Sequence, residues 1–202
     1  MTVQRRWSSG TKGVPREERE EQILTAAAAE FGARGHAGGS VQRIAAAAGI
    51  SRAMVHTYYA TKDVLYVTCV ERAGEPLVAA VAAAQGALDP QQRAVDTVRA
   101  ILTALEGRRD DWAILFDATV APGSALREAG RPYRRELRRL GSVGTAETLH
   151  RSGNPDPVDA QLFGRMWLGM VSTVVAWWLE HPDESADAAC ERFRRILGAF
   201  AP

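Results

Sequence analysis

The chain has 202 residues, of which 46% are hydrophobic and 24% are charged, a balance typical of soluble globular proteins. This length allows one sizeable core or two small domains. Alanine is abundant, and the nine prolines and most of the eighteen glycines fall between periodic runs, which favours an all-α fold. The formal net charge is +1, but residues 1–63 hold nine Lys or Arg against six Asp or Glu, so the remainder carries −2. The N-terminal third is therefore mildly basic and the rest slightly acidic.

The apolar segments argue against a membrane protein. No continuous apolar run is expected to be long enough to span a bilayer, and the N-terminal segment lacks the apolar stretch of a signal peptide. We therefore expect a cytoplasmic protein without a membrane partner. Cys69 and Cys190 lie far apart on helical patterns. Buried free thiols are favoured over a disulfide in that compartment.

The chain starts with an irregular segment and then a helix. Residues 1–14 mix Arg, Ser, Gly and Lys without a period, so we expect a disordered arm. Pro15 opens a helix whose first turns are rich in glutamate, where the helix dipole favours acids. This helix is expected to end between Gly32 and Gly35. Its buried row consists of Ile23, Ala27 and Phe31.

Residues 40–62 have the pattern of two short helices joined by a tight turn. Ser40 is a good N-cap for the first helix, Gly49 supplies the permissive backbone that ends it, and Ser51 can cap the second. The second helix has one apolar face, whereas its other face carries donors and flat groups that add little to a core. Because a helix-turn-helix motif places its second helix in the major groove, this pattern predicts DNA binding.

Helices are expected throughout the remainder of the chain. Thr61 caps a connector helix that starts at about residue 62 and reaches Ala84, and Pro76 is expected to kink or split it. Further helices are expected over about residues 91–106, 110–120, 132–150, 158–180 and 185–200. The predicted fold is all-α, with a three-helix helix-turn-helix head on a helical body. The predicted divisions are the arm at 1–14, a DNA-binding domain at 15–62 and a ligand-binding and dimerisation domain at 63–202.

The helix expected over residues 158–180 is apolar almost all round. A helix with two apolar faces must be covered on both of them. We therefore expect the last two helices to pair with their counterparts in a homodimer, and burial in the protomer's own core is the alternative. The candidate interface residues are Leu162, Val174, Trp178, Phe193, Leu197 and Phe200.

The N-terminal third carries a specific set of residues at fixed spacing. They are Ile23-Leu24, Ala27-Ala28, Phe31, Gly35, Ser40-Val41, Ile44-Ala45, Gly49-Ile50-Ser51, Val55, Tyr59 and Lys62-Asp63-Val64-Leu65. This set, which covers about residues 16–66, resembles the tetracycline-repressor-like (TetR) family of transcription regulators. The resemblance implies a ligand-responsive regulator, in our expectation a repressor. As a homodimer it would bind an inverted-repeat operator, and a small hydrophobic or aromatic effector would release it.

The resemblance also assigns roles to individual residues. Gln42, Arg52, Ala53, Met54, His56 and Thr57 fall where the family meets base edges, and Ser40, Tyr58 and Lys62 fall where it meets phosphates. Their chemistry agrees, because a Gln amide can pair with adenine and an Arg guanidinium with guanine. The sequence departs from the family pattern at His56, where Tyr is usual, and at Tyr59, where Phe is usual. His56 could make DNA binding depend on pH.

The implied partners are a double-stranded DNA operator, a second copy of the chain and a small-molecule effector whose identity the sequence leaves open. Aromatic and apolar residues on the helices that would enclose the effector favour a flat or hydrophobic ligand. For any one of them, a place in the core is the more common alternative. They are Trp112, Phe116, Tyr133, Phe163, Met166, Trp167 and Met170.

Enzymatic functions find little support in the sequence. The four histidines and two cysteines form no closely spaced ligand set, and the chain has no nucleophile elbow, phosphate loop or dinucleotide fingerprint. We therefore expect no catalytic activity, no metal and no cofactor. The alternative function is a helical small-molecule-binding dimer without specific DNA recognition, which would leave Arg52, Tyr58 and Lys62 without a role.

Overall fold

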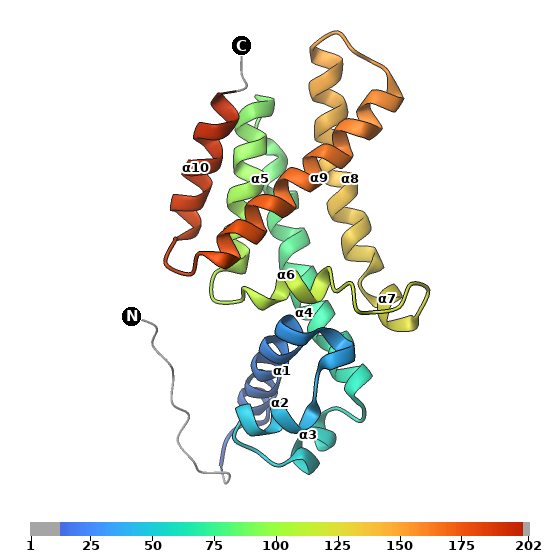
Figure 1. Cartoon of the computed structure of the whole chain (residues 1–202), viewed down its shortest axis with the longest axis vertical. Helices are drawn as coiled ribbons and strands as arrows, with labels where there is room; N and C mark the ends of the chain where they lie inside the picture. Colours follow the sequence, from blue (N-terminus) through green and yellow to red (C-terminus); the bar gives the residue numbers. More distant parts are fainter. Residues whose placement is uncertain (1–12, 200–202) are drawn as a thin grey trace. The chain divides into compact units, whose positions relative to one another are not determined.

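The computed structural model describes residues 13–199, so the predicted arm falls almost wholly outside the described residues, as does Phe200. All regular elements of the described chain are helices (Figure 1), which confirms the predicted all-α fold. They are α1 (Arg16–Gly38), α2 (Val41–Ala47), α3 (Arg52–Tyr58), α4 (Lys62–Ala83), the 3₁₀ turn η1 (Ala84–Gly86), α5 (Pro90–Leu105), α6 (Asp110–Leu115), α7 (Ala125–Ala129), α8 (Arg131–Arg151), α9 (Pro157–Glu180) and α10 (Ala186–Gly198).

The described residues form two compact units. The first, which we call the head unit, contains residues 13–73 and 110–130, and the second, the body unit, contains residues 74–109 and 131–199. The division falls within α4, and the predicted DNA-binding domain at 15–62 lies wholly inside the head unit. It also places α6 and α7 in the head unit, where α6 packs against α1.

The core of the head unit combines α1 with the helix-turn-helix. The predicted row on α1 is buried, and Ile44 of α2 and Val55 of α3 are buried as well. Tyr66 of α4 and Phe31 of α1 pack in a T-shaped arrangement, with ring centroids 5.2 Å apart and an interplanar angle of 85°. Burying side chains of this size stabilises the unit by about 1.5–3 kcal/mol each, before entropy costs.

Side-chain caps fix where several helices begin. The hydroxyl oxygens of Ser40, Ser51, Thr61 and Ser124 each accept a hydrogen bond from the backbone N–H three residues later, at 3.4, 3.1, 3.1 and 3.2 Å. The caps at Ser40, Ser51 and Thr61 are the ones predicted from the sequence, and each of the four satisfies a donor that the first helical turn leaves unpaired.

Helix α4 is continuous from Lys62 to Ala83 although it contains Pro76. Of the two predicted outcomes at Pro76, a kink or a split, the split does not occur. A proline inside a helix removes one backbone donor and clashes with the preceding turn, at a cost of about 3 kcal/mol. Burial of Leu77 and Val81 on the same helix offsets that cost.

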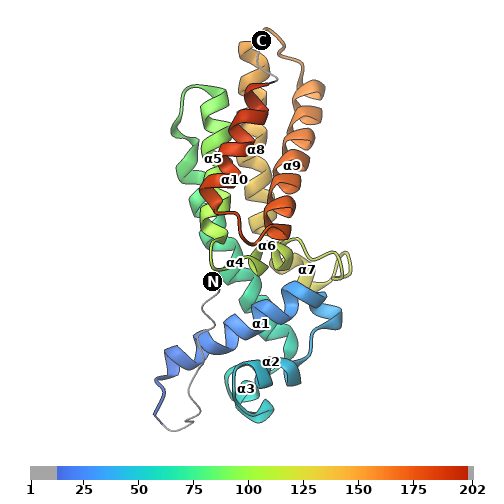
Figure 2. The same ribbon diagram turned by 60° about the vertical axis from the view of Figure 1, so that its left-hand side comes forward.

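The body unit is a layered arrangement of long helices. Helix α8 lies beside α9, and α10 lies beside α5 (Figure 2). Helix α5 contributes a continuous buried stripe, which meets buried residues of α9 and α10 in the unit's core. These residues are Val95, Val98, Ile101, Leu102, Leu105, Val171, Val175, Trp178, Ala189, Cys190 and Phe193.

Helix α9 leaves part of its apolar surface uncovered within the protomer. Val158, Leu162 and Met166, spaced by four residues, are 70%, 58% and 62% exposed. By length and composition alone α9 could cross a membrane, with a mean hydropathy of 1.3 over its most apolar window, of which 17% is buried. This corrects the expectation that no run is long enough. The same length and composition also occur in core helices of soluble proteins, so they are weak evidence for a membrane span.

Both cysteines are free thiols buried in the protein interior. Cys69 lies in the head unit and Cys190 in the body unit. Burial raises the pKa of the Cys69 thiol to about 12 and also raises the pKa of Cys190. Both groups are therefore protonated at neutral pH.

Candidate DNA-reading surface and ligand cavity

Helix α3 has one buried face and one exposed polar face. Val55 is buried, and Arg52, His56 and Thr57 are exposed. The Arg52 Nε donates a hydrogen bond to the His56 Nε2 at 3.4 Å, which places these two predicted base-reading side chains together, one turn apart. The exposed face of α3 therefore presents a guanidinium and an imidazole on one surface.

The turn between α2 and α3 has the geometry that the sequence predicts. Gly49 has a φ of 68°, in the left-handed region that favours glycine. The N–H of Ile50 donates to the carbonyl of Ala45 at 3.0 Å and closes the end of α2. Gln42, the predicted adenine-reading residue, lies exposed on α2.

The N-terminus of α2 is held by a buried carboxylate that the sequence analysis missed. Glu30 of α1 accepts hydrogen bonds from the backbone N–H of Ser40 at 3.0 Å and from the Nε of Arg43 at 2.8 Å. The hydrogen bond from Arg43 lowers the pKa of Glu30 despite its burial. Because Arg43 also donates to the Gly38 carbonyl at 2.7 Å, it ties α2 to the end of α1 although its side chain is 49% exposed. The only sequence signal for this pair was an acid within the alanine-rich stretch of α1.

The three predicted phosphate contacts have structural partners within the head unit. Ser40 caps α2, and the Arg16 guanidinium lies 5.6 Å from the centroid of the Tyr58 ring. The Lys62 Nζ donates to the carbonyls of His36 and Gly39, at 2.9 and 3.3 Å. Lys62 thus ties the start of α4 to the end of α1.

Buried Asp117, after α6, fastens the α6–α7 segment to the rest of the head unit. Its Oδ2 accepts hydrogen bonds from the His36 backbone N–H at 2.8 Å and from the Tyr66 hydroxyl at 3.1 Å, and its Oδ1 accepts from the Thr119 N–H at 2.8 Å. Burial alone would raise the pKa of this carboxyl, but the hydrogen bonds outweigh it and the pKa is lowered. Asp117 is therefore a charged acceptor at neutral pH.

Acid should weaken the head unit through Asp117. Because the folded pKa lies below the unfolded value of about 3.9, the carboxylate's contribution is fully present above that pH and is lost as the pH falls through the folded pKa. The Asp117→Asn variant should be less stable at pH 7 and show a smaller loss of unfolding free energy between pH 5 and about pH 3. Urea titrations across this range measure both slopes, and equal slopes would refute the assignment.

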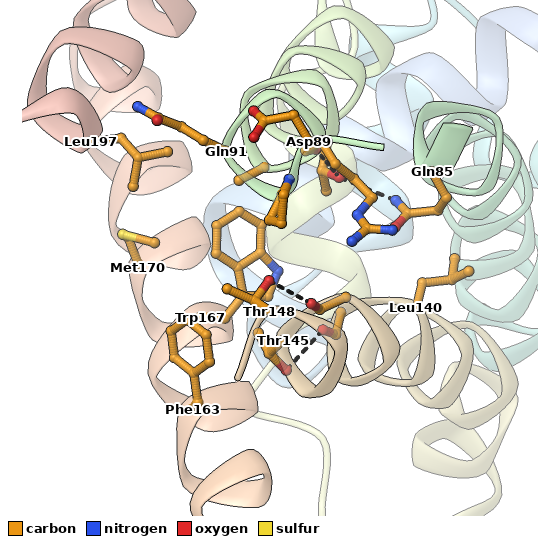
Figure 3. Close-up of a pocket in the computed structure, with 16 residues that line it drawn as sticks. Gln85, Asp89, Gln91, Leu140, Thr145, Thr148, Phe163, Trp167, Met170 and Leu197 are labelled. Atoms are coloured by element: carbon orange, nitrogen blue, oxygen red, sulfur yellow. Dashed lines mark hydrogen bonds between the residues drawn. The ribbon is translucent and has the colours of Figure 1, made fainter. Parts of the chain in front are cut away.

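The body unit contains a cavity of about 380 Å³ (Figure 3). Phe163, Trp167 and Met170 of α9 line one side, with Gln85 across the cavity from them. Helix α8 contributes Leu140, and α10 contributes Leu197. The other lining residues are Asp89, Pro90, Gln91, Arg93, Ala94, Thr97, Gly141, Gly144, Thr145 and Thr148. The volume and mostly apolar lining are those of a small-molecule site.

The predicted effector-binding residues do not all lie together in the structure. Phe163, Trp167 and Met170 line the cavity together. Met166 is 62% exposed on α9, outside the lining. The remaining three lie elsewhere: Trp112 and Phe116 are in the head unit, with ring centroids 4.4 Å apart, and the Tyr133 ring packs on Gly74 in the body unit.

The predicted dimer residues also separate into two groups. Leu162 is exposed, and Val174 and Leu197 are half-buried. Trp178 and Phe193 are buried within the protomer, and Phe200 lies outside the described residues. The exposed apolar row on α9 thus consists of Val158, Leu162 and Met166.

Comparison with known proteins identifies the family. The family model described as bacterial regulatory proteins of the tetR family matches residues 23–69, which contain the whole helix-turn-helix. The chain is also 26% identical to a TetR-like transcriptional regulator from Rhodococcus sp. RHA1, with a TM-score of 0.68 over 92% of this chain and 96% of that one. The chain is a TetR-family transcriptional regulator. This confirms the predicted family and the helix-turn-helix assignment. Members of the TetR family are generally non-enzymatic DNA-binding proteins.

Two further proteins are similar to this chain. The structure of AibR in complex with isovaleryl coenzyme A and operator DNA is 22% identical, with a TM-score of 0.70 over 88% of this chain and 97% of AibR, a likeness that shows the TetR fold alone. The transcriptional activator FasR of Mycolicibacterium smegmatis is 30% identical over 105 residues. That match covers 52% of this chain and 48% of FasR, so it spans about half the length of that relative.

Proposed function

We propose that this protein is a ligand-responsive repressor that binds an inverted-repeat operator as a homodimer and leaves it when a small apolar molecule occupies the body cavity. The observation that carries the proposal is the exposed polar face of α3, where Arg52 and His56 lie together on a helix held by the Ser51 cap and the buried Val55. Such a face adds nothing to the core and matches the donors that base edges require.

Dimerisation is the second part of the proposal. Val158, Leu162 and Met166 form an apolar row that the protomer does not cover, and exposed rows of this kind mark protein interfaces. A twofold axis through this surface would present two copies of α3 to the two halves of an inverted repeat, separated by about 34–36 Å or a multiple of that spacing.

The effector is the third part. The aromatic and sulfur-containing wall made by Phe163, Trp167 and Met170 favours a flat or hydrophobic ligand. AibR is described with an acyl coenzyme A thioester, so short acyl thioesters belong in a ligand screen of this protein. By linkage, an effector that weakens operator binding must itself bind the operator complex more weakly by the same factor.

Selection from a random library of duplex DNA tests operator recognition. We expect enrichment of an inverted repeat, and in mobility-shift assays on that repeat we expect Arg52→Ala to weaken binding by about 10- to 100-fold, the range of one good bidentate base contact. Arg138→Ala, which removes an exposed arginine of the body unit, is the matched control and should change affinity little. Failure to enrich any sequence at low salt would instead favour the ligand-binding dimer without specific DNA recognition.

The direction of regulation needs its own measurement, since FasR is named an activator. Transcription in vitro from a promoter that carries the selected repeat should fall when the protein is added. A rise in transcript would replace the repressor proposal with activation and leave the DNA-reading assignment intact.

A further inference from the structure

We infer that the ligand part held inside the body cavity is uncharged and carries a hydrogen-bond acceptor, such as a carbonyl oxygen, that pairs with Arg93. This inference rests on the proposed role of the cavity as the effector site and specifies the chemistry of that ligand. It concerns a residue that the sequence patterns did not single out.

Arg93 of α5 brings an unmet donor to the cavity wall. Its side chain is 12% exposed, and its Nη1 pairs with the Glu147 Oε2 at 2.8 Å. Its Nη2 is buried and has no hydrogen-bond partner among residues 13–199. A buried donor without an acceptor costs about 1–3 kcal/mol. Because Nη2 is buried in the cavity wall, a rotation of the Arg93 side chain must bring it to a ligand acceptor, which would then recover that cost. Arg93 is thereby a specificity element rather than a purely structural residue.

The charges around Arg93 favour a neutral ligand over an anion. Glu147 already pairs with Arg93, and its other oxygen accepts a hydrogen bond from Arg151 at 2.7 Å. Asp89, a further cavity-lining residue, adds a second carboxylate, so the two arginines and two acids sum to zero. An anion would lose its hydration near two carboxylates without a net positive field to compensate, whereas a carbonyl needs only the donor.

The other polar groups of the wall do not replace this donor. The Thr145 hydroxyl donates to the Gly141 carbonyl at 3.1 Å, and the Thr148 hydroxyl donates to the Gly144 carbonyl at 2.8 Å. The Gln85 amide nitrogen donates to the Val81 carbonyl at 2.8 Å. The Trp167 indole N–H and the Gln91 amide are further donors of the lining, but both are neutral. Since Phe163, Met170 and Leu197 make the rest of that side apolar, the ligand that fits has an apolar body and a carbonyl directed towards the charged donor on α5.

Three probes of similar shape test this chemistry. Acetophenone carries a carbonyl, ethylbenzene lacks an acceptor and benzoate carries a charge. In ligand-observed NMR titrations of the full-length protein we expect acetophenone to bind at least about 10-fold more tightly than ethylbenzene, the value of a hydrogen bond to a charged donor. Acetophenone should also bind more tightly than benzoate.

Two arginine variants test whether Arg93 causes the preference for acetophenone over ethylbenzene. Arg93→Met should bring acetophenone binding to the level of ethylbenzene while leaving ethylbenzene unchanged. Arg99→Met, on the same helix but half-exposed, should preserve the order of the three probes. The relative affinities of the three probes are measured on the unaltered protein. The inference can therefore be tested even if the Arg93→Met variant folds poorly.

The outcomes separate this inference from the proposed function. Equal binding of acetophenone and ethylbenzene, tighter binding of benzoate, or no binding by any probe up to its solubility limit overturns the inference. Binding in the expected order without any change in operator affinity supports the inference and instead contradicts effector release from DNA, which the mobility-shift assay measures separately.

Discussion

Replacing Trp178 with alanine should destabilise the body unit by about 3–5 kcal/mol, the usual cost of deleting a large buried aromatic side chain. Trp178 is fully buried, and its indole N–H donates to the Glu184 carbonyl at 2.9 Å. The Arg109 guanidinium lies 4.0 Å from the ring centroid, and Arg109 also donates to the Trp178 carbonyl at 3.3 Å. The substitution therefore creates a cavity and removes the indole ring that the Arg109 guanidinium contacts.

Urea unfolding followed by circular dichroism measures this loss. Trp177→Ala is the matched control, because Trp177 is the adjacent residue but is half-buried and stacks on His181 with centroids 4.2 Å apart. It should cost about 1 kcal/mol, as do most substitutions outside a tightly packed core. Similar losses in the two variants would show that Trp178 is not the anchor of this core.

Replacing Gly35 with alanine should destabilise the head unit by about 3 kcal/mol or more, because strained backbone and steric overlap add. Gly35 interrupts α1 with φ 65° and ψ 175°, a conformation that is essentially restricted to glycine. A Cβ atom at this position would lie 2.3 Å from the Thr119 Oγ1 and 3.0 Å from the Asp117 Oδ1. The substitution therefore also pushes away the segment that Asp117 fastens to α1.

Gly49→Ala separates the two contributions. Gly49 also has a positive φ, 68°, but an added Cβ would meet nothing within 4 Å. It should cost about 1–2 kcal/mol from the backbone alone. Thermal unfolding and operator binding of both variants should rank Gly35→Ala as clearly the more damaging, and equal damage would contradict the steric argument.

Local features of the fold were predictable because they depend on neighbouring residues. The caps at Ser40, Ser51 and Thr61 follow from short-range hydrogen bonding and the left-handed Gly49 from its lack of a side chain, and all of them occur in the structure. The buried row on α1 follows in the same way from helical periodicity.

Features that depend on distant residues were not predictable. Asp117 reaches the His36 N–H across 81 positions of the chain, and this bond helps place α6 and α7 in the head unit. For that reason Trp112 and Phe116, although aromatic and on a predicted helix, lie in a different unit from the cavity. The split predicted as one outcome at Pro76 does not occur, because burial of apolar side chains along α4 outweighs the local free-energy cost of a proline inside a helix.

The residues of the candidate sites were likewise predictable only where local sequence determines their position. The exposed residues of α3 could be named from helix-turn-helix geometry, and they remain predicted base contacts. Lys62 was assigned to phosphates from the family resemblance and stays a predicted contact, while the structure adds that its ammonium donates to the carbonyls of His36 and Gly39. Arg93 gave no sequence signal beyond a charge next to the apolar stripe of α5. Its importance depends on Glu147, 54 positions further along the chain.

The positions of the two cysteines provide a chemical readout of each unit. The thiolate is the reactive form, and burial suppresses it at both Cys69 and Cys190. The folded protein should therefore tolerate oxidants and alkylating reagents that modify exposed thiols. Since one cysteine lies in the head unit and the other in the body unit, the rate at which each is labelled reports the opening of its own unit. Mass spectrometry of the two peptides would then show which unit a ligand or a DNA duplex holds closed.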